Sequence, residues 1–382
     1  MHQTSPVRPP LPRRPEEVPG IFDWFRHGRE DSPVALEERN GTRWWHVLRY
    51  EDVARVLTDH AHFSSRVPEF EYGPLSDTML VKDPPDHRKL RSLVNLAFTP
   101  RAVARLSDRV AEMTQELLDR VRARGEMDIV RDIAAPLPAQ VICEMLGVPE
   151  SDWGGMRMWA HLDGSGPGRG GMHSYFRDLL DARRRSPRDD LVSALSTAEI
   201  DGERLSEREL VNFCTLLLFA GQETTKNLIA NFFLTLSDHP DDQARLTREK
   251  ALVPAAIEEV LRFLPPVWFL MRRATADVEL SGVRIPAGGM VMPWVASANR
   301  DATQFTDPDR FDIARDPNRH LGFGHGIHFC IGAPLSRMEA GVVLPMMLEQ
   351  LQDVRVVRET PIGIRAGIVF VITNLPVTFQ PY

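Results

Sequence analysis

The sequence predicts an α+β protein that is predominantly α-helical, with small β-sheets near its N-terminus and its C-terminus. Two observations lead to this prediction. From residue 84 to residue 263, apolar residues recur at spacings of three and four, as on one buried face of a helix. Runs rich in Val, Ile and Phe occur instead between residues 34 and 47 and after residue 278. Because these runs do not alternate with helices, the pattern does not predict a parallel sheet of the alternating α/β type.

The N-terminal part of the chain predicts a tail followed by a hairpin. Residues 1–19 are rich in Pro and Arg and are expected to be extended or loosely ordered. Asn40-Gly41 separates two strand-like runs, 34–38 and 42–47, and this dipeptide is a strong signal for a tight turn. A short helix is expected over 51–57.

Two irregular segments are candidates for functional loops. Residues 60–82 have no regular pattern but carry aromatic residues, and a loop of this length in a compact domain is usually functional. Residues 164–171 are glycine-rich. They can be either a hinge or lid loop between two helices or a plain surface linker.

The remaining elements are assigned by the same patterns. Apolar spacing predicts helices over 86–98, 101–124, 136–146, 173–185, 206–237 and 248–263. Strands are expected over 278–280, 283–285 and 290–294, with more in 354–379. The chain has 382 residues, which is more than one core usually carries, so two subdomains can share it.

Composition and charge argue against several classes of protein. The net charge of −7 does not suit a nucleic-acid binder. The 3 cysteines are too few and too scattered for a disulfide framework, so a reducing, cytoplasmic location is expected. No stretch resembles a signal peptide or an uninterrupted membrane span, so no membrane anchor is expected. A monomer is expected.

The most informative segment runs from Phe323 to Gly332 and contains a single cysteine, Cys330. A dinucleotide-binding loop would need a third glycine, which is missing. A zinc site is disfavoured because His325 and His328 lie too close to the cysteine and no fourth ligand is apparent. A catalytic cysteine would need a base from elsewhere. The segment alone leaves two interpretations open: a buried cysteine in a glycine-rich turn, or a thiolate presented to haem and stabilised by the helix N-terminus that follows.

A second segment, from Ala220 to Thr225, places Gly and two β-branched residues inside the longest predicted helix, against their propensity. The Thr224 hydroxyl can donate to the Ala220 carbonyl, which bends or opens a helix. The Glu223 carboxylate is then available for handling protons. Leu216, Ala220 and Thr224 share one face, where a flat cofactor could approach. Taken alone, the segment is explained more simply by a buried helix with one kink.

Several charged residues are candidates for a network or for binding carboxylates. Glu259 and Arg262 lie at i, i+3 on an amphipathic helix, where such pairs are usually exposed. His87 and Arg91 lie at i, i+4 just inside a helix start. Two carboxylates could be bound by such cations, and arginine suits this task best. The further cationic or donor residues are Arg272, Arg273 and His320.

Four patterns occur in an order that resembles the cytochrome P450 family of the soluble bacterial type. They are AGxETT from Ala220, ExxR from Glu259, PDRF from Pro308 and FGxGxHxCxG from Phe323. The resemblance covers nearly the whole chain from the Asn40-Gly41 turn onward. It implies the cytochrome P450 fold, with residues 20–382 as a single catalytic domain after the tail.

The resemblance also implies a role for each matched residue. Cys330 would be the axial thiolate of haem b, with Phe323 near its sulfur. Thr224 and Glu223 would deliver protons to bound O2. Four residues would bind the haem propionates, namely His87, Arg91, Arg272 and His320. Ala220 would also contact the haem. The buried network behind the haem would consist of Glu259, Arg262 and Arg310. The implied substrate pocket is lined by Phe70, Tyr72, Leu216, Ala220, Val267, Trp268 and Phe269.

The function implied is that of a haem-thiolate monooxygenase. It would use O2 to hydroxylate or epoxidise a small apolar or amphipathic organic substrate in bacterial secondary metabolism. Electrons would come from NAD(P)H through a ferredoxin reductase and a ferredoxin. One alternative keeps the fold but catalyses oxidative coupling, cyclisation or desaturation without oxygen insertion. A haem-based sensor without turnover is another, and a cysteine hydrolase or zinc protein would carry no haem.

Overall fold

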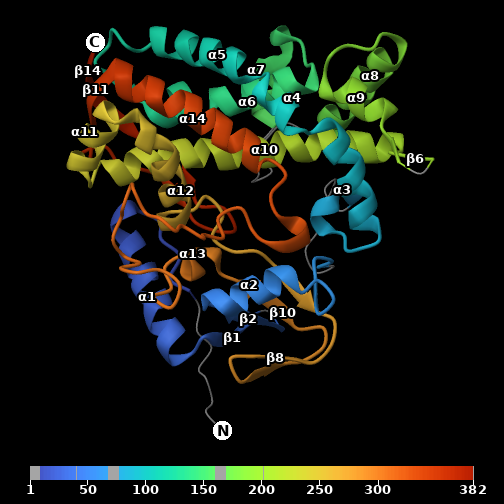
Figure 1. Cartoon of the computed structure of the whole chain (residues 1–382), viewed down its shortest axis with the longest axis vertical. Helices are drawn as coiled ribbons and strands as arrows, with labels where there is room; N and C mark the ends of the chain where they lie inside the picture. The colour runs from blue at the N-terminus through green and yellow to red at the C-terminus, as the bar shows by residue number, and fades with distance from the viewer. Residues whose placement is uncertain (1–8, 40, 68–76, 160–168, 201, 382) are drawn as a thin grey trace. The chain divides into compact units, whose positions relative to one another are not determined.

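The computed structural model describes residues 9–39, 41–67, 77–159, 169–200 and 202–381. Over these residues the protein is predominantly helical with several small sheets, which confirms the predicted fold class (Figure 1). The chain divides into two compact units. Unit 1 comprises Met1–Glu69, Ala230–Cys330 and Arg355–Pro376, and unit 2 comprises Phe70–Ile229, Ile331–Val354 and Val377–Tyr382. That residues 20–382 form a single domain stays a prediction.

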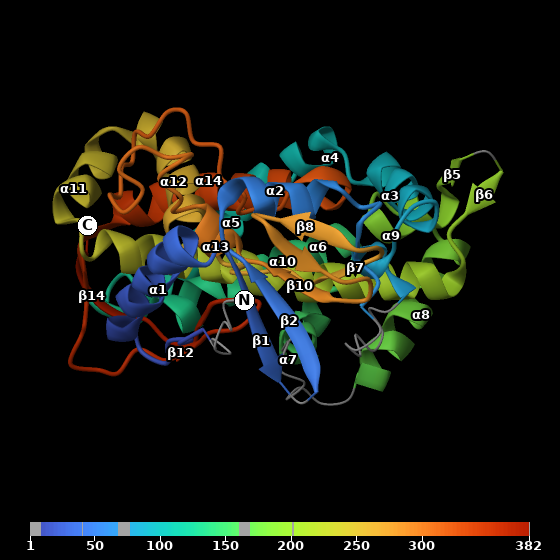
Figure 2. The ribbon, with the colours of Figure 1, turned by 90° about the horizontal axis from the view of Figure 1, so that it is seen from below.

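Unit 1 is built on a five-stranded sheet in the order β1-β2-β10-β7-β3 (Figure 2). The strands are β1 (Val34–Arg39), β2 (Thr42–Val47), β3 (Phe63–Ser64), β7 (Arg272–Ala274) and β10 (Met290–Pro293). β1 pairs antiparallel with β2, with Arg39 opposite Thr42, which confirms the predicted hairpin. Asn40 lies outside the described residues. β10 runs parallel to β2 and antiparallel to β7.

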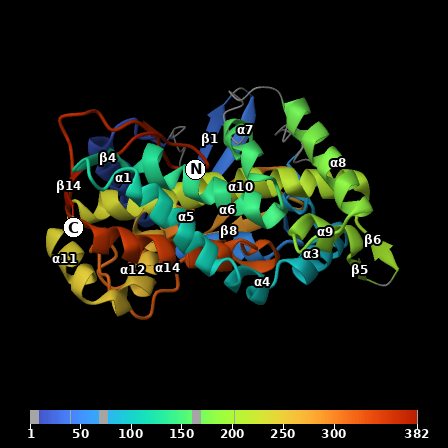
Figure 3. The same ribbon diagram turned by 90° about the horizontal axis from the view of Figure 1, so that it is seen from above.

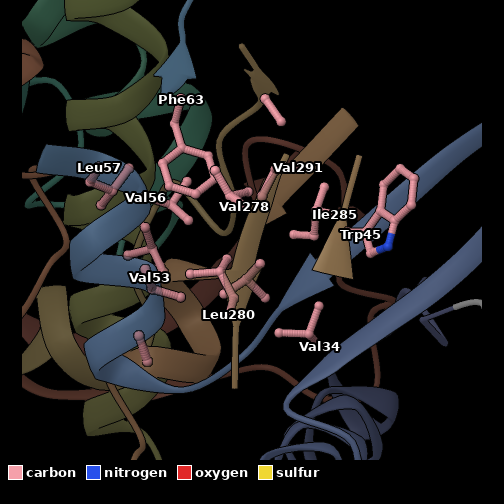
Figure 4. Packing of buried hydrophobic residues seen from close by; sticks show 14 of the residues in the cluster. Val34, Trp45, Val53, Val56, Leu57, Phe63, Val278, Leu280, Ile285 and Val291 are labelled. Carbon is pink, nitrogen blue, oxygen red and sulfur yellow. The ribbon is translucent and has the colours of Figure 1, made fainter. Parts of the chain in front are cut away.

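A buried apolar cluster fixes helix α2 (Tyr50–Thr58) against strands of unit 1 (Figure 4). Val53, Val56 and Leu57 from this helix belong to the cluster, together with Phe63 from β3 and Val291 from β10. The hairpin of β8 (Val278–Leu280) and β9 (Val283–Ile285) adds further apolar residues. The C-terminal end of α2 is therefore held firmly, and it is this end that contacts the cysteine loop described below.

The first helix corrects the prediction for the N-terminus. The segments η1 (Pro15–Glu17) and α1 (Val18–Asp31) are helical, so the expectation of a loose tail is wrong from residue 15 onward. α1 buries Ile21, Phe22 and Phe25 along one face. Proline in the first turn is compatible with a helix start, because the N–H it lacks would have had no partner there.

The other elements of unit 1 are short. Its helices are α11 (Pro240–Arg248), η6 (Lys250–Leu252), α12 (Val253–Phe263), α13 (Val295–Ala298) and η7 (Gly326–His328), and its last strands are β12 (Ile364–Arg365) and β13 (Val371–Ile372). The helix predicted over 248–263 is thus interrupted, with its regular part in α12.

Unit 2 is mostly helical. Its helices are η3 (Met79–Val81), α3 (Asp86–Ala97), α4 (Pro100–Ala104), α5 (Ser107–Asp119), η4 (Val130–Ala134), α6 (Pro136–Leu146), η5 (Glu150–Asp152), α7 (Trp153–Trp159), α8 (Arg169–Arg185), α9 (Leu191–Thr197) and α14 (Ala333–Gln350). The small strands outside unit 1's sheets are β4 (Glu126–Asp128), β5 (Glu199–Ile200), β6 (Glu203–Arg204), β11 (Leu351–Val356) and β14 (Pro376–Pro381). α5 and α14 lie side by side, as Figure 3 shows.

The longest helix is α10 (Glu207–Leu236), which contributes residues to both units. It was predicted over 206–237. Along the described parts of the chain, no helix is both long and apolar enough to cross a membrane.

Candidate functional site

The cysteine loop of unit 1 is closed by its own backbone. The N–H of Cys330 donates to the carbonyl oxygen of Phe323 at 2.9 Å, and the N–H of Phe329 donates to that of Gly326 at 3.1 Å. Gly326 has a φ of +70°, and a Cβ there would lie 2.7 Å from the backbone oxygen of Leu57, at the end of α2. Only glycine therefore fits where the loop crosses α2.

Cys330 differs from the other two cysteines in its accessibility. Cys143 and Cys214 are buried, and burial raises the pKa of each thiol to about 12. These two side chains are therefore protonated core groups. Cys330 is exposed, as is the neighbouring Phe329 ring. Of the three cysteines, only Cys330 can reach an external ligand, and it does so beside an apolar ring.

Helix α10 has one accessible strip. Between Leu210 and Leu236 every residue is buried except Ala220, which is exposed, and Gly221 and Thr224, which are half-buried. The small side chain of Ala220 leaves the backbone of this strip accessible, whereas Gly221 packs closely against Ile142 of α6. A flat group such as haem fits a strip of small residues, and an exposed cysteine in an apolar loop suits its iron. The accessible strip of α10 and the cysteine loop of unit 1 are thus each compatible with haem.

The predicted hydrogen bond in α10 is present. The Thr224 hydroxyl donates to the carbonyl oxygen of Ala220 at 2.7 Å. The helix was expected to bend or open at this bond, and α10 continues through these residues without interruption. Such a bond adds to the helical ladder here without replacing it.

Glu223, the second residue predicted to handle protons, is buried and forms an ion pair with Lys226. Lys226 was not among the residues predicted for the site. Its position three residues after Glu223, one helical turn along, was the available signal.

The residues predicted to bind carboxylates fall into both units. His87 is buried on α3, and Arg91 lies half-buried one turn further along the same helix. Arg272 is buried on β7 and donates to the carbonyl of Met271 at 2.8 Å, whereas Arg273 is half-buried.

His320 does not suit the role predicted for it. Its Nε2 lies 2.9 Å from a carboxylate oxygen of Glu258, and its Nδ1 accepts from the backbone N–H of Gly322 at 3.0 Å. Both ring nitrogens are therefore engaged. His328, two residues before Cys330 in the loop, was considered only as a zinc ligand. Its Nε2 lies 2.9 Å from the Ser65 hydroxyl oxygen.

The Glu259–Arg262 pair is a buried network, as the resemblance implied. Two guanidinium nitrogens of Arg262 donate to the two carboxylate oxygens of Glu259, both at 2.8 Å. The third member is Arg315, whose Nε donates to Glu259 at 3.1 Å. The prediction of Arg310 is wrong for its side chain, which is exposed and pairs with Asp312. Only the backbone carbonyl of Arg310 takes part, accepting from Arg262 and Arg315.

The residues predicted to line the pocket differ in how accessible they are. Phe70 and Tyr72 lie outside the described residues. Leu216 is buried on α10, while Val267 is half-buried. The prediction that Trp268 lines the pocket is wrong, because its side chain has no exposed surface and stacks on Phe370 with 4.7 Å between ring centroids.

Phe269 is also a core residue. Only 8% of it is exposed, and its ring packs at 4.6 Å from that of Trp294. Neither Trp268 nor Phe269 presents the accessible surface that lining a pocket requires.

The interpretation of the cysteine segment as a zinc site gains no support. No group of three or more His, Cys, Asp or Glu residues in the described ranges could hold a metal ion.

Comparison with known proteins gives one consistent family. A family model described as cytochrome P450 matches residues 30–147 and 173–362. The putative cytochrome P450 YjiB of Bacillus subtilis (strain 168) is 40% identical over 358 residues, covering 89% of this chain and 90% of that protein. The cyclomarin C epoxidase CymV of Salinispora arenicola (strain CNS-205) is 43% identical over 357 residues, covering 88% and 90%.

Solved structures agree with these relatives. Cytochrome P450 CYP109Q5 from Chondromyces apiculatus is similar with a TM-score of 0.91 and 39% identity, covering 96% of this chain and 97% of that one. CYP109E1 from Bacillus megaterium in complex with testosterone is similar with a TM-score of 0.87 and 36% identity, covering 94% and 98%.

Proposed function

This chain belongs to the cytochrome P450 family and is a monooxygenase, and we propose that Cys330 is the thiolate ligand of its haem iron. The observation that carries the proposal is the exposure of Cys330, since Cys143 and Cys214 are buried thiols. As the ligand of haem b, the Cys330 thiolate would supply electron density to the iron, which favours O–O cleavage. Its electrons are proposed to come from NAD(P)H through a ferredoxin reductase and a ferredoxin.

The protein's part at Cys330 is to hold the sulfur in place and keep it deprotonated. The backbone bond from Cys330 to Phe323 fixes the loop. The contact of Gly326 with α2 fixes its position on unit 1. A thiolate ahead of a helix N-terminus, here that of α14, is stabilised by the free N–H groups of the first turn.

Proton handling is proposed for Thr224 and Glu223. Because the Thr224 hydroxyl donates its own hydrogen to Ala220, its oxygen lone pairs point away from that carbonyl and can accept from a water molecule. Glu223 is the acidic group next to it in the chain. Together they offer a hydroxyl acceptor on the accessible strip of α10 and, next to it in the chain, a buried carboxylate that is paired with Lys226.

Carboxylate groups of the haem are proposed to be held by His87, Arg91 and Arg272, with His328 in place of His320. His328 lies in the same loop as Cys330, whereas both ring nitrogens of His320 are engaged. Arginine and histidine can each donate charge-assisted hydrogen bonds to carboxylates.

The substrate is proposed to be a small apolar or amphipathic organic compound of bacterial secondary metabolism, which is hydroxylated or epoxidised. Two observations support this class: one similar protein is named an epoxidase of cyclomarin C, and one similar structure contains testosterone. No observation favours the coupling or sensor alternatives.

The test of the substrate class is a screen of such compounds against the purified ferric protein. Binding that displaces water from the iron changes the spin state and shifts the Soret band. Apolar polycyclic and macrocyclic compounds are expected to give the shift. A response only to small polar compounds would contradict the proposal.

A further inference from the structure

A cavity of about 680 Å³ lies within unit 1, and none of its lining residues belongs to the cysteine loop or to the accessible strip of α10. Its walls come from α1, the C-terminal end of α10 and the end of α12. The apolar residues that line it include Val18, Phe22, Leu234, Phe263 and Leu264. Binding sites for small molecules are typically cavities of about 300–1,000 Å³ that combine apolar walls with a few polar groups. This cavity has the size and the lining of such a site.

One wall of the cavity is held in place by the buried side chain of Arg300, which is 6% exposed. Its guanidinium carbon lies 4.2 Å from the ring centroid of Phe22 on α1 and 3.5 Å from that of Phe263 on α12. Two of its nitrogens also donate to the carbonyl oxygen of Phe263, at 3.2 and 2.8 Å. These contacts tie α1 to the end of α12, so the cavity between them is a defined feature of the fold.

Two polar residues that line the cavity have acceptors available. Thr235 is 5% exposed, and its hydroxyl oxygen has no hydrogen-bond partner among the described residues. The Nδ1 of His239 lies 2.8 Å from the carbonyl oxygen of Thr235. Because a carbonyl oxygen only accepts, Nδ1 carries the hydrogen, and Nε2 of the neutral ring is left as an acceptor. A buried hydroxyl without a partner is unfavourable, so a bound molecule with hydrogens to donate would relieve this cost.

The charged residues of the lining leave one carboxylate unpaired. Three aspartates are each bonded to an arginine. These pairs are Arg26–Asp23 at 2.8 Å, Arg300–Asp309 at 3.0 Å and Arg358–Asp238. Glu16, on η1, also lines the cavity, is exposed, and has no ion-pair or hydrogen-bond partner within the described ranges. The lining therefore carries one uncompensated negative charge.

We propose that this cavity is a second binding site, separate from the haem site, for a compound that has an apolar ring body and a protonated amine. The ring body packs against the apolar walls, and the ammonium group donates to the acceptors of the lining. The charge of Glu16 favours the ammonium group over a neutral hydroxyl. Binding to the folded chain stabilises unit 1 by mass action. This inference goes beyond the proposed function and does not depend on which residue ligates the iron.

The test uses two probes with the same rings: 1-naphthylmethylamine, which is protonated at neutral pH, and 1-naphthalenemethanol, which is not charged. Affinities are measured by isothermal titration calorimetry on the reduced holoprotein under carbon monoxide, so that the amine cannot ligate the iron. The variants are Glu16→Gln, Thr235→Val and Val18→Trp, whose larger ring fills part of the cavity. Two matched controls lie on α1 at exposed positions outside the lining: Glu30→Gln and Gly20→Trp, where a Cβ would meet nothing within 4 Å.

Wild type is expected to bind the amine about two- to fivefold more tightly than the alcohol, the effect of an exposed charge pair. Glu16→Gln is expected to abolish this preference and to leave the affinity for the alcohol unchanged. Val18→Trp is expected to weaken the binding of both probes by about tenfold or more, because the rings lose their apolar contacts. Thr235→Val is expected to weaken binding without lowering the unfolding midpoint of the free protein, because the hydroxyl that it removes has no partner there. Both controls are expected to match wild type.

Three results would overturn the inference. The first is equal affinity of wild type for the two probes, and the second is wild-type binding in Val18→Trp. The third is an equal loss of the preference in Glu16→Gln and Glu30→Gln, which would make it an effect of general surface charge. If Val18→Trp does not fold, wild-type binding in both Glu16→Gln and Thr235→Val overturns the inference in its place. A wild-type protein without the thiolate-haem spectrum would instead overturn the proposed function.

Discussion

The Thr224 hydroxyl donates to the carbonyl oxygen of Ala220 at 2.7 Å. Thr215, on the same helix, makes the same kind of bond to Val211 at 2.9 Å. The two threonines differ in their surroundings, since Thr215 has no exposed surface while Thr224 lies on the accessible strip of α10. The bond itself is thus a local property of threonine in a helix, and exposure distinguishes Thr224, for which proton handling is proposed, from Thr215.

Thr224→Ala is expected to divert electrons from product or water to hydrogen peroxide, because it removes the hydroxyl that can accept from water. The peroxide released per reductant consumed measures this. Thr224→Ser, which keeps a hydroxyl, is expected to stay near wild type. Thr215→Ala loses an equivalent bond without affecting proton handling, so an equal rise in peroxide there would refute the assignment.

Arg315→Ala is expected to destabilise the protein far more than Arg310→Ala. Removing Arg315 leaves Glu259, which has no exposed surface, short of a partner, and breaking a buried pair costs about 3–5 kcal/mol. Arg310 is exposed, so its loss is expected to stay within about 0.5 kcal/mol. Urea unfolding of both variants measures this difference. Equal midpoints would contradict Arg315 as the third member of the network.

His46 is expected to make unit 1 sensitive to acid. Trp294 Nε1 donates to His46 Nδ1 at 2.9 Å, and His46 Nε2 lies 3.0 Å from Glu37, so the ring is neutral with its hydrogen on Nε2. Burial lowers the pKa of His46. As the pH falls below about 6.5, the unfolded chain takes up a proton that the folded chain does not, and stability decreases.

The measurement is the unfolding free energy of wild type and His46→Gln between about pH 7.5 and pH 5. Gln can still donate and accept but does not titrate. The wild type is expected to lose more stability over this interval than the variant. Parallel pH profiles would argue against a neutral, buried His46.

Glu339 is expected to have the opposite pH dependence. It is buried on α14, and one of its carboxyl oxygens has no hydrogen-bond partner among the described residues. Burial raises the pKa of this carboxyl well above its usual value. As the pH rises above about 4.3, the unfolded chain loses a proton that the folded chain keeps, so stability decreases with rising pH.

Glu339→Gln has nearly the same shape as the neutral acid and does not titrate. Its stability relative to wild type is therefore expected to increase from about pH 4.5 to about pH 8. Unfolding midpoints across this range test the prediction. A constant difference between the two proteins would show that Glu339 does not stay protonated.

Local rules explain what could be predicted from the sequence. The Asn40-Gly41 hairpin, the helix over 136–146 and the hydrogen bond from Thr224 to Ala220 all depend on residues a few positions apart. The cysteine motif is also local. The first helix was missed because Pro19, Gly20 and Gly28 are unfavourable for helices, although tertiary burial of its apolar face outweighs that propensity.

Long-range partners explain what could not be predicted. Trp268 was predicted to line a pocket because its stacking partner, Phe370, lies about a hundred residues later in the sequence. Arg310 and Arg315 are both plausible partners of Glu259 by spacing, and only the path of the loop decides between them. Spacing does not reveal that Glu258 engages His320.

Ligation of the haem iron by Cys330 is tested by the reduced, carbon-monoxide-bound absorption spectrum. We expect the red-shifted Soret band of a thiolate-bound haem in wild type and in Cys143→Ala and Cys214→Ala, whose thiols are buried. We expect the band to be lost in Cys330→Ala. Absence of the band from wild type, or its survival in Cys330→Ala, would show that Cys330 is not the ligand.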